Sequence, residues 1–144
     1  MPPELSRYLF VAGGLPFLVL GALHARATPR SPEARAGLSP SDPQLTAAMV
    51  ATWPRITRRT TMWLTWVGFN FSHSLGAVAF GAFVVAIGRS AASYGAQAAV
   101  CGPLAVVVAA GYLVLALKYW FRIPIVGCAL ALLLFLAAWA TGPA

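Results

Sequence analysis

The polar side chains that could do chemistry lie together in one apolar stretch, residues 68–76, with the sequence GFNFSHSLG. Asn70 and His73 are three positions apart and share a face of a helix that has 3.6 residues per turn. Trp66, one turn before Asn70, extends that face. An imidazole can bind a metal or carry a proton near neutral pH, and an amide can hydrogen-bond a ligand. Trp66, Asn70 and His73 therefore form the candidate site for a small ligand.

A metal site shared by two side chains is not expected from the sequence. The other histidine, His24, lies near the end of the first apolar run. If the cytoplasmic ends of the first two runs are level, His73 lies about twelve residues, or roughly 18 Å, deeper in the membrane. Cys101 and Cys128 are also expected at different depths, so they predict neither a disulfide nor a metal site.

Two roles remain open for His73. The preferred interpretation is structural, with His73 and Asn70 hydrogen-bonded to a neighbouring helix and no cofactor bound. The alternative is that His73 binds a haem-like, pigment or quinone ligand inside the membrane, because an ionisable group there is often functional.

Enzyme signatures are missing from the sequence. It contains no HExxH, GxSxG or Walker motif. The acidic residues Glu4, Glu33 and Asp42 lie outside the apolar runs. We therefore predict no catalytic residues and expect a protein that is not an enzyme.

Gly68, Ser72 and Gly76 form a second stripe, at four-residue spacing, beside the polar one. Such small-xxx-small stripes allow two membrane helices to approach closely. We expect this ridge to pack against another helix, so that Gly76→Leu disturbs packing more than Gly81→Leu.

The composition indicates what positions these residues. The chain has 144 residues, of which 60% are hydrophobic and 9% charged, and its mean hydropathy is +0.78. A helix needs about 20 apolar residues to cross a bilayer, and lipid excludes open strands. Four runs satisfy this length, so we predict one all-α membrane domain, residues 1–144, with four transmembrane helices at about residues 8–24, 61–87, 94–117 and 123–141.

The basic residues predict the orientation of the helices. Arg7 and Arg89 lie on one side, and eight basic residues lie on the other, namely Arg26, Arg30, Arg35, Arg55, Arg58, Arg59, Lys118 and Arg122. Cytoplasmic loops carry the excess of Lys and Arg. Both termini are therefore expected on the non-cytoplasmic side of a bacterial inner membrane. This placement also argues against nucleic acid as a partner.

The loop between the first two apolar runs predicts a short helix. Asp42 is a suitable N-cap, Pro43 fits the first helical position and Pro54 stops the helix. This segment either lies on the membrane interface or forms a turn packed on the bundle. A candidate lipid-headgroup patch consists of basic residues near Trp and Tyr, namely Arg55, Arg58, Arg59, Lys118 and Arg122.

Two longer motifs resemble a family of small bacterial four-helix membrane proteins of unknown function. The motifs are ITRRTTMWLTWVGFNFSHSLG at residues 56–76 and YWFRIP at residues 119–124, and His24 and Asp42–Pro43 also fit the resemblance. The resemblance implies the four-helix fold and no particular activity.

The function must therefore be inferred from the physics of the chain. The preferred hypothesis is a non-catalytic accessory or scaffolding subunit that contacts lipids and packs against the transmembrane subunits of a larger complex, for example a photosynthetic or respiratory one. The alternative is an intramembrane site for a quinone, lipid or haem-like ligand built on Trp66, Asn70 and His73.

Overall fold

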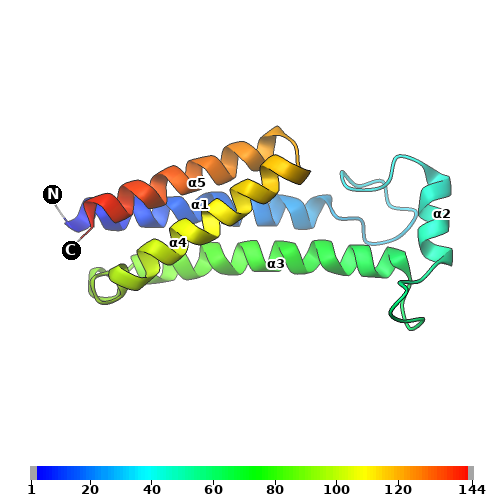
Figure 1. The fold of residues 1–144 in the computed structure, drawn as a ribbon, viewed down its shortest axis with the longest axis horizontal. Coiled ribbons are helices and arrows are strands. Elements are labelled where there is room, and N and C mark those ends of the chain that lie inside the picture. The colour runs from blue at the N-terminus through cyan, green and yellow to red at the C-terminus, as the bar shows by residue number, and fades with distance from the viewer. Residues whose placement is uncertain (1–2, 143–144) are drawn as a thin grey trace. The chain divides into compact units, whose positions relative to one another are not determined.

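The structure, a computed structural model, describes residues 3–142, and every regular element in this range is a helix. The five helices follow one another along the chain (Figure 1) as α1 Pro3–Ala27, α2 Pro43–Ala51, α3 Met62–Gly88, α4 Ala91–Tyr119 and α5 Arg122–Thr141.

Four of the described helices are long and apolar enough to cross a membrane. They are α1, α3, α4 and α5, and their apolar segments have 24, 27, 29 and 20 residues. The predicted all-helical class and the four long apolar helices are confirmed, and their bounds agree with the predicted spans to within about a turn of helix at most ends.

The helix predicted in the loop is present as α2. Asp42 caps it, because its Oδ1 accepts a hydrogen bond from the Gln44 amide at 2.8 Å, and Pro43 occupies the first turn. The helix ends at Ala51, before Pro54, and none of its residues is buried. Its position on a membrane interface stays a prediction.

Very short connections separate α3 from α4 and α4 from α5. The backbone at Ser90 is extended, and its hydroxyl accepts a hydrogen bond from the Ser93 amide at 3.3 Å, which caps the start of α4. Trp120 and Phe121, both extended, separate α4 from α5. Connections of this length force consecutive helices to run in opposite directions.

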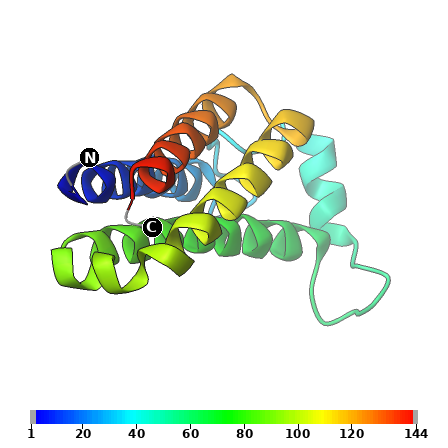
Figure 2. The same cartoon turned by 60° about the vertical axis from the view of Figure 1, so that its left-hand side comes forward.

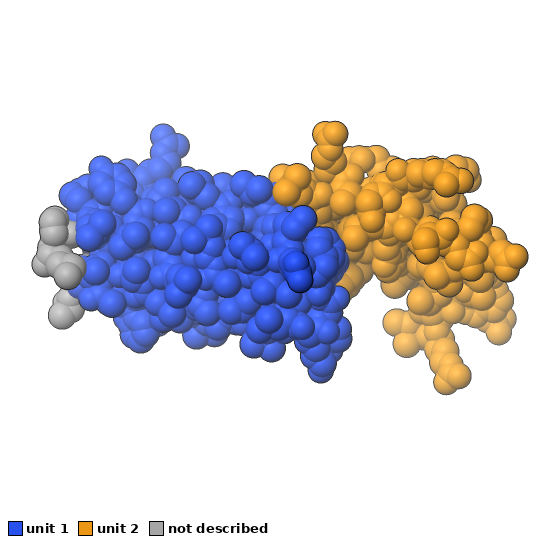
Figure 3. All heavy atoms as spheres, turned by 90° about the horizontal axis from the view of Figure 1, so that it is seen from above, with its two compact units in different colours: residues 1–20, 77–144 blue, residues 21–76 orange. Residues whose placement is uncertain are grey.

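The chain divides into two compact units (Figure 3), residues 1–20 with 77–144 as unit 1, and residues 21–76 as unit 2. Helices α1 and α3 contribute residues to both units. The single membrane domain stays a prediction.

Unit 1 is built around the antiparallel pair α4 and α5, which pack on each other (Figure 2). The ring of Phe17 in α1 makes edge contacts with Phe80 in α3 and Tyr112 in α4, at centroid distances of 4.7 and 5.2 Å. The ring centroid of Phe10 in α1 lies 5.7 Å from that of Phe135 in α5. Alanines on the facing sides of α4 and α5 fill the remaining core, namely Ala98, Ala105, Ala109, Ala131 and Ala138.

Helices α1 and α3 approach each other closely in unit 1 at a pair of glycines. A Cβ atom on Gly81 would lie 2.7 Å from the Gly14 carbonyl oxygen, and a Cβ atom on Gly14 would lie 2.8 Å from Cγ1 of Val84. Neither position can accept a side chain without movement of a backbone or a buried side chain, so these glycines set the distance between the two helices.

The residues of the predicted ridge lie on the exposed side of α3. Gly68, Ser72 and Gly76 are exposed, and a Cβ atom on Gly68 would meet no atom within 4 Å. Gly81, by contrast, does make a close helix contact, and the comparison of Gly76→Leu with Gly81→Leu stays a prediction. The spacing of small residues on one helix does not show which stripe has small residues opposite it, and Gly81 has Gly14 opposite. Packing of the ridge against another chain stays a prediction.

Unit 2 holds the end of α1, the loop and the first half of α3. The loop is tied to α1 where the Leu38 amide donates to the Ala27 carbonyl at 2.9 Å. It is tied to α3 where the Met62 amide donates to the Thr52 carbonyl at 2.8 Å. These bonds attach the loop to the end of α1 and to the start of α3.

Candidate functional site

Asn70 is the centre of a polar cluster in unit 2, and its side-chain orientation is fixed. It is only 5% exposed. Its Nδ2 donates a hydrogen bond to the Trp66 carbonyl oxygen, one turn earlier in α3, at 2.8 Å. Because a carbonyl can only accept, the nitrogen of the amide must face Trp66 and Oδ1 must point the other way.

His24, in the last turn of α1, meets that oxygen. Its Nε2 lies 2.9 Å from Oδ1 of Asn70. Since the amide oxygen only accepts, His24 donates from Nε2, and in the neutral ring Nδ1 carries the lone pair. The Thr28 hydroxyl donates to the His24 carbonyl at 2.8 Å and closes the end of α1 around this residue.

His73 lies against His24, with ring centroids 5.0 Å apart and planes at 60°. The sequence expectation that the two rings lie far apart in depth is therefore wrong. That expectation set the ends of the two helices level, whereas α3 begins about eight residues, roughly 12 Å, before the position that meets His24. The loop folds along these extra turns, so the start of α3 is not level with the end of α1.

The buried side of α3 agrees with the predicted polar stripe. Trp63 is 4% exposed, Asn70 is buried, and Trp66 and His73 are half-buried. The rings of Trp63 and Trp66 lie 5.6 Å apart. The predicted inward orientation of Asn70 therefore fits its burial.

Sequence reasoning missed His24 as a member of the cluster. The available signal was an imidazole, His24, near the end of the first apolar run and a polar stripe in the next apolar run. Pairing two polar groups of neighbouring helices removes the cost of burying either one alone. The pairing of His24 with Asn70 was not proposed because the start of α3 was assumed to be level with the end of α1.

The serines beside His73 are not arranged for nucleophilic catalysis. Ser74 is buried and its hydroxyl donates to the Asn70 carbonyl at 2.9 Å, while the Ser72 hydroxyl donates to the Phe69 carbonyl at the same distance. Each hydroxyl is thus engaged by the backbone of its own helix. What the cluster offers chemically is two imidazoles and one oriented amide oxygen.

Among the described residues no group of three or more His, Cys, Asp and Glu side chains could hold a metal ion. Cys101 and Cys128 are both free thiols. The nearest further side-chain donor in the polar cluster is the Oδ1 atom of Asn70, 2.9 Å from His24 Nε2.

The basic residues of the predicted headgroup patch are all exposed, but they belong to different units. Arg55, Arg58 and Arg59 lie in the loop of unit 2, and Lys118 and Arg122 flank the turn between α4 and α5 in unit 1. Arg58 lies over the ring of Trp53 at 5.1 Å. A single patch formed by all five stays a prediction.

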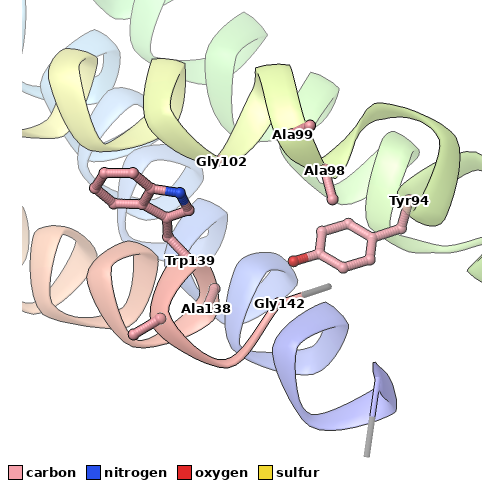
Figure 4. Close-up of a pocket in the computed structure, with 8 residues that line it drawn as sticks. Tyr94, Ala98, Ala99, Gly102, Ala138, Trp139 and Gly142 are labelled. Carbon is pink, nitrogen blue, oxygen red and sulfur yellow. The ribbon is translucent and has the colours of Figure 1, made fainter. Parts of the chain in front are cut away.

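Unit 1 contains a cavity of about 260 Å³ between α4 and α5 (Figure 4). Tyr94 and Trp139 lie on opposite sides of it, and small residues such as Gly102 and Ala98 form its α4 wall. The Ser6 hydroxyl is hydrogen-bonded to the Tyr94 hydroxyl and donates to the Ala138 carbonyl at 2.7 Å. These bonds join α1, α4 and α5, and the sequence did not predict this cavity.

Comparison of the chain with protein-family models, with curated proteins and with solved structures gives no match. The resemblance carried by residues 56–76 and 119–124 stays a prediction. Function is therefore inferred from the geometry of the chain alone.

Proposed function

We propose that the protein is a non-catalytic accessory subunit that packs against a transmembrane helix of a larger membrane complex. The observation that supports this proposal is the exposed ridge of Gly68, Ser72 and Gly76 on α3. A Cβ atom on Gly68 would have no neighbour within 4 Å. A helix stripe of small residues leaves a shallow groove, and in lipid the close packing of a second helix is what such a groove favours.

The ridge is tested by Gly68→Leu with Gly111→Leu as its matched control. Gly111 is also a helical glycine, and a Cβ atom added to it would meet no atom within 4 Å. Its neighbours at four-residue spacing are Val107 and Leu115 rather than small residues. Gly68→Leu should leave folded yield unchanged and abolish co-purification of partner subunits from native membranes. Loss of partners with neither variant, or with both, contradicts the proposal.

A second candidate function is an intramembrane ligand site at Trp66, Asn70 and His73. The observation that favours it is the arrival of His24 from α1, which places two imidazoles 5.0 Å apart beside an oriented amide. Native purification followed by mass spectrometry and an absorption spectrum separates the two functions. Co-purifying subunits support the first, and a bound chromophore, quinone or lipid supports the second.

The proposed location is the bacterial inner membrane, with both termini on the non-cytoplasmic side. The excess of basic residues in the loop between α1 and α3 and in the turn between α4 and α5 supports this orientation. In the same frame α2 and the loop lie at the cytoplasmic surface. Exposed Leu45, Trp53 and Ile56 beside Arg55 and the neighbouring arginines would then contact anionic lipid.

A further inference from the structure

We propose that His24, Asn70 and His73 bind one late first-row transition-metal ion, held by two imidazole nitrogens and the amide oxygen. This inference rests on the second candidate function, because it uses the same cluster and specifies what the cluster takes. It is independent of the ridge on the exposed side of α3.

The separations within the cluster suit a shared ion. His24 Nε2 and Asn70 Oδ1 are 2.9 Å apart, and two donor atoms bound to one ion at about 2.0–2.2 Å and near a right angle are roughly 3 Å apart. The His24 and His73 ring centroids are 5.0 Å apart. Two imidazoles that share an ion at such bond lengths place their ring centres roughly 5–6 Å apart.

The cluster is also pre-oriented by its surroundings. The Trp66 carbonyl holds the Asn70 amide so that its oxygen faces His24. The Thr28 hydroxyl donates a hydrogen bond to the His24 carbonyl, and this bond fixes the helical turn that carries the His24 ring. Outer hydrogen bonds of this kind orient metal ligands and are a regular part of metal sites.

The proton balance of binding follows from the tautomer. In the structure His24 donates from Nε2 to Oδ1 of Asn70. When an ion binds at Nε2, the hydrogen on that nitrogen moves to Nδ1, and coordination replaces the hydrogen bond. The ring stays neutral and no proton is lost overall, which distinguishes this site from thiolate sites, where ligands must be deprotonated.

The donor set selects the class of ion. Imidazole suits zinc, copper, iron and nickel, whereas magnesium and calcium require several oxygen ligands, usually charged. In the described part of the chain no carboxylate or thiolate completes a larger cluster. Copper should bind most tightly, since Cu²⁺ forms the strongest complexes in the first-row divalent series.

The test uses the full chain in detergent, with any histidine tag removed and with Cys101→Ser and Cys128→Ala in the background, because thiols also bind copper. Equilibrium titration with Cu²⁺ and electron paramagnetic resonance are the readouts. We expect one ion per chain, with nitrogen couplings from two imidazoles. His73→Gln should weaken binding by about 10- to 100-fold and leave couplings from one imidazole.

Asn70→Asp provides a readout that a purely structural cluster would not give. A carboxylate at this position loses the hydrogen bond that the Asn70 amide donates to the Trp66 carbonyl. It should nevertheless tighten binding of Cu²⁺, because it supplies a charged oxygen in place of a neutral one. The double variant His24→Gln with His73→Gln measures adventitious binding elsewhere. Circular dichroism confirms that each variant is folded.

Three outcomes overturn the proposal. These are no binding above the double variant, binding that His73→Gln leaves unchanged, and nitrogen couplings that do not change when either histidine is replaced. Gly68→Leu distinguishes failure of the metal site from failure of the accessory function, because this variant should lose partner subunits and still bind the metal. Loss of partners without any metal site would leave the accessory function standing and refute this inference alone.

Discussion

One backbone carbonyl determines the chemistry of the polar cluster. The Trp66 oxygen receives the Asn70 amide hydrogen, which turns Oδ1 toward α1. His24 must then donate from Nε2. A single intrahelical hydrogen bond thus sets the tautomer of a ring that lies 46 residues earlier in the chain. Membrane helices favour such pairings, because an unsatisfied amide in hydrocarbon costs several kcal/mol, on the order of a lost hydrogen bond or more.

The role of His73 is tested by comparing His73→Gln with His73→Leu. If His73 is structural, Gln should behave like the wild type, because it keeps a donor and an acceptor. Leu should then lose stability by about 0.6–2 kcal/mol, the range measured for hydrogen bonds between membrane helices. Folded yield and thermal stability in detergent are the measurements.

The outcome against the structural role is specific. If His73→Gln folds as well as wild type and loses a bound ion, chromophore or activity, His73 is a functional ligand. An amide neither ligates a metal as an imidazole does nor titrates near neutral pH.

At the scale of helices, the close contact of α1 and α3 in unit 1 depends on glycine. A Cβ atom on Gly81 would lie 2.7 Å from the Gly14 carbonyl oxygen and 2.8 Å from Cγ of Leu18. Helix pairs in lipid are stabilised by such close packing, since there is no hydrophobic driving force between them. The contact at Gly81 is therefore expected to contribute to the stability of the α1–α3 pair.

We therefore expect Gly81→Leu to destabilise the fold by about 1–3 kcal/mol, the usual cost of forcing a large side chain into a packed contact. Thermal unfolding in detergent measures the loss. Gly111→Leu, at an open glycine of α4, should leave the unfolding temperature unchanged. Equal stabilities of the two variants would mean that α1 and α3 do not approach closely at Gly81.

At the scale of the whole molecule, the distribution of charge predicts how the chain sits in the membrane. Eight of the ten basic residues lie in the last turn of α1, between α1 and α3, or beside the turn between α4 and α5. Short loops rich in Lys and Arg stay in the cytoplasm. If all four long helices cross the membrane, both termini are predicted on the opposite side.

Reporter fusions check this orientation. A reporter that is active only outside the cytoplasm should be active when fused after the last residue. The same reporter fused after Arg59, before α3, should be inactive, and a cytoplasm-dependent reporter should give the reverse pattern. Cytoplasmic activity at the carboxyl terminus would overturn the orientation.

The sequence by itself determined the helical class and the number of long apolar helices. Apolar runs of this length leave the backbone no alternative to helix in lipid. Local chemistry also placed α2, since Asp42 and Pro43 act on their own first turn and need no distant partner. The shared face of Trp66, Asn70 and His73 followed from helical periodicity alone.

Only the tertiary structure decided which stripes meet. Periodicity gives the face of a helix and not its axial offset from the next helix. His24 was therefore expected far from His73, although the two rings are in contact. The close approach at Gly81 likewise depends on Gly14, a residue of another helix. Contacts of this kind depend on how far α3 extends beyond α1 and on which residues lie opposite, and these are properties of two segments together rather than of either one.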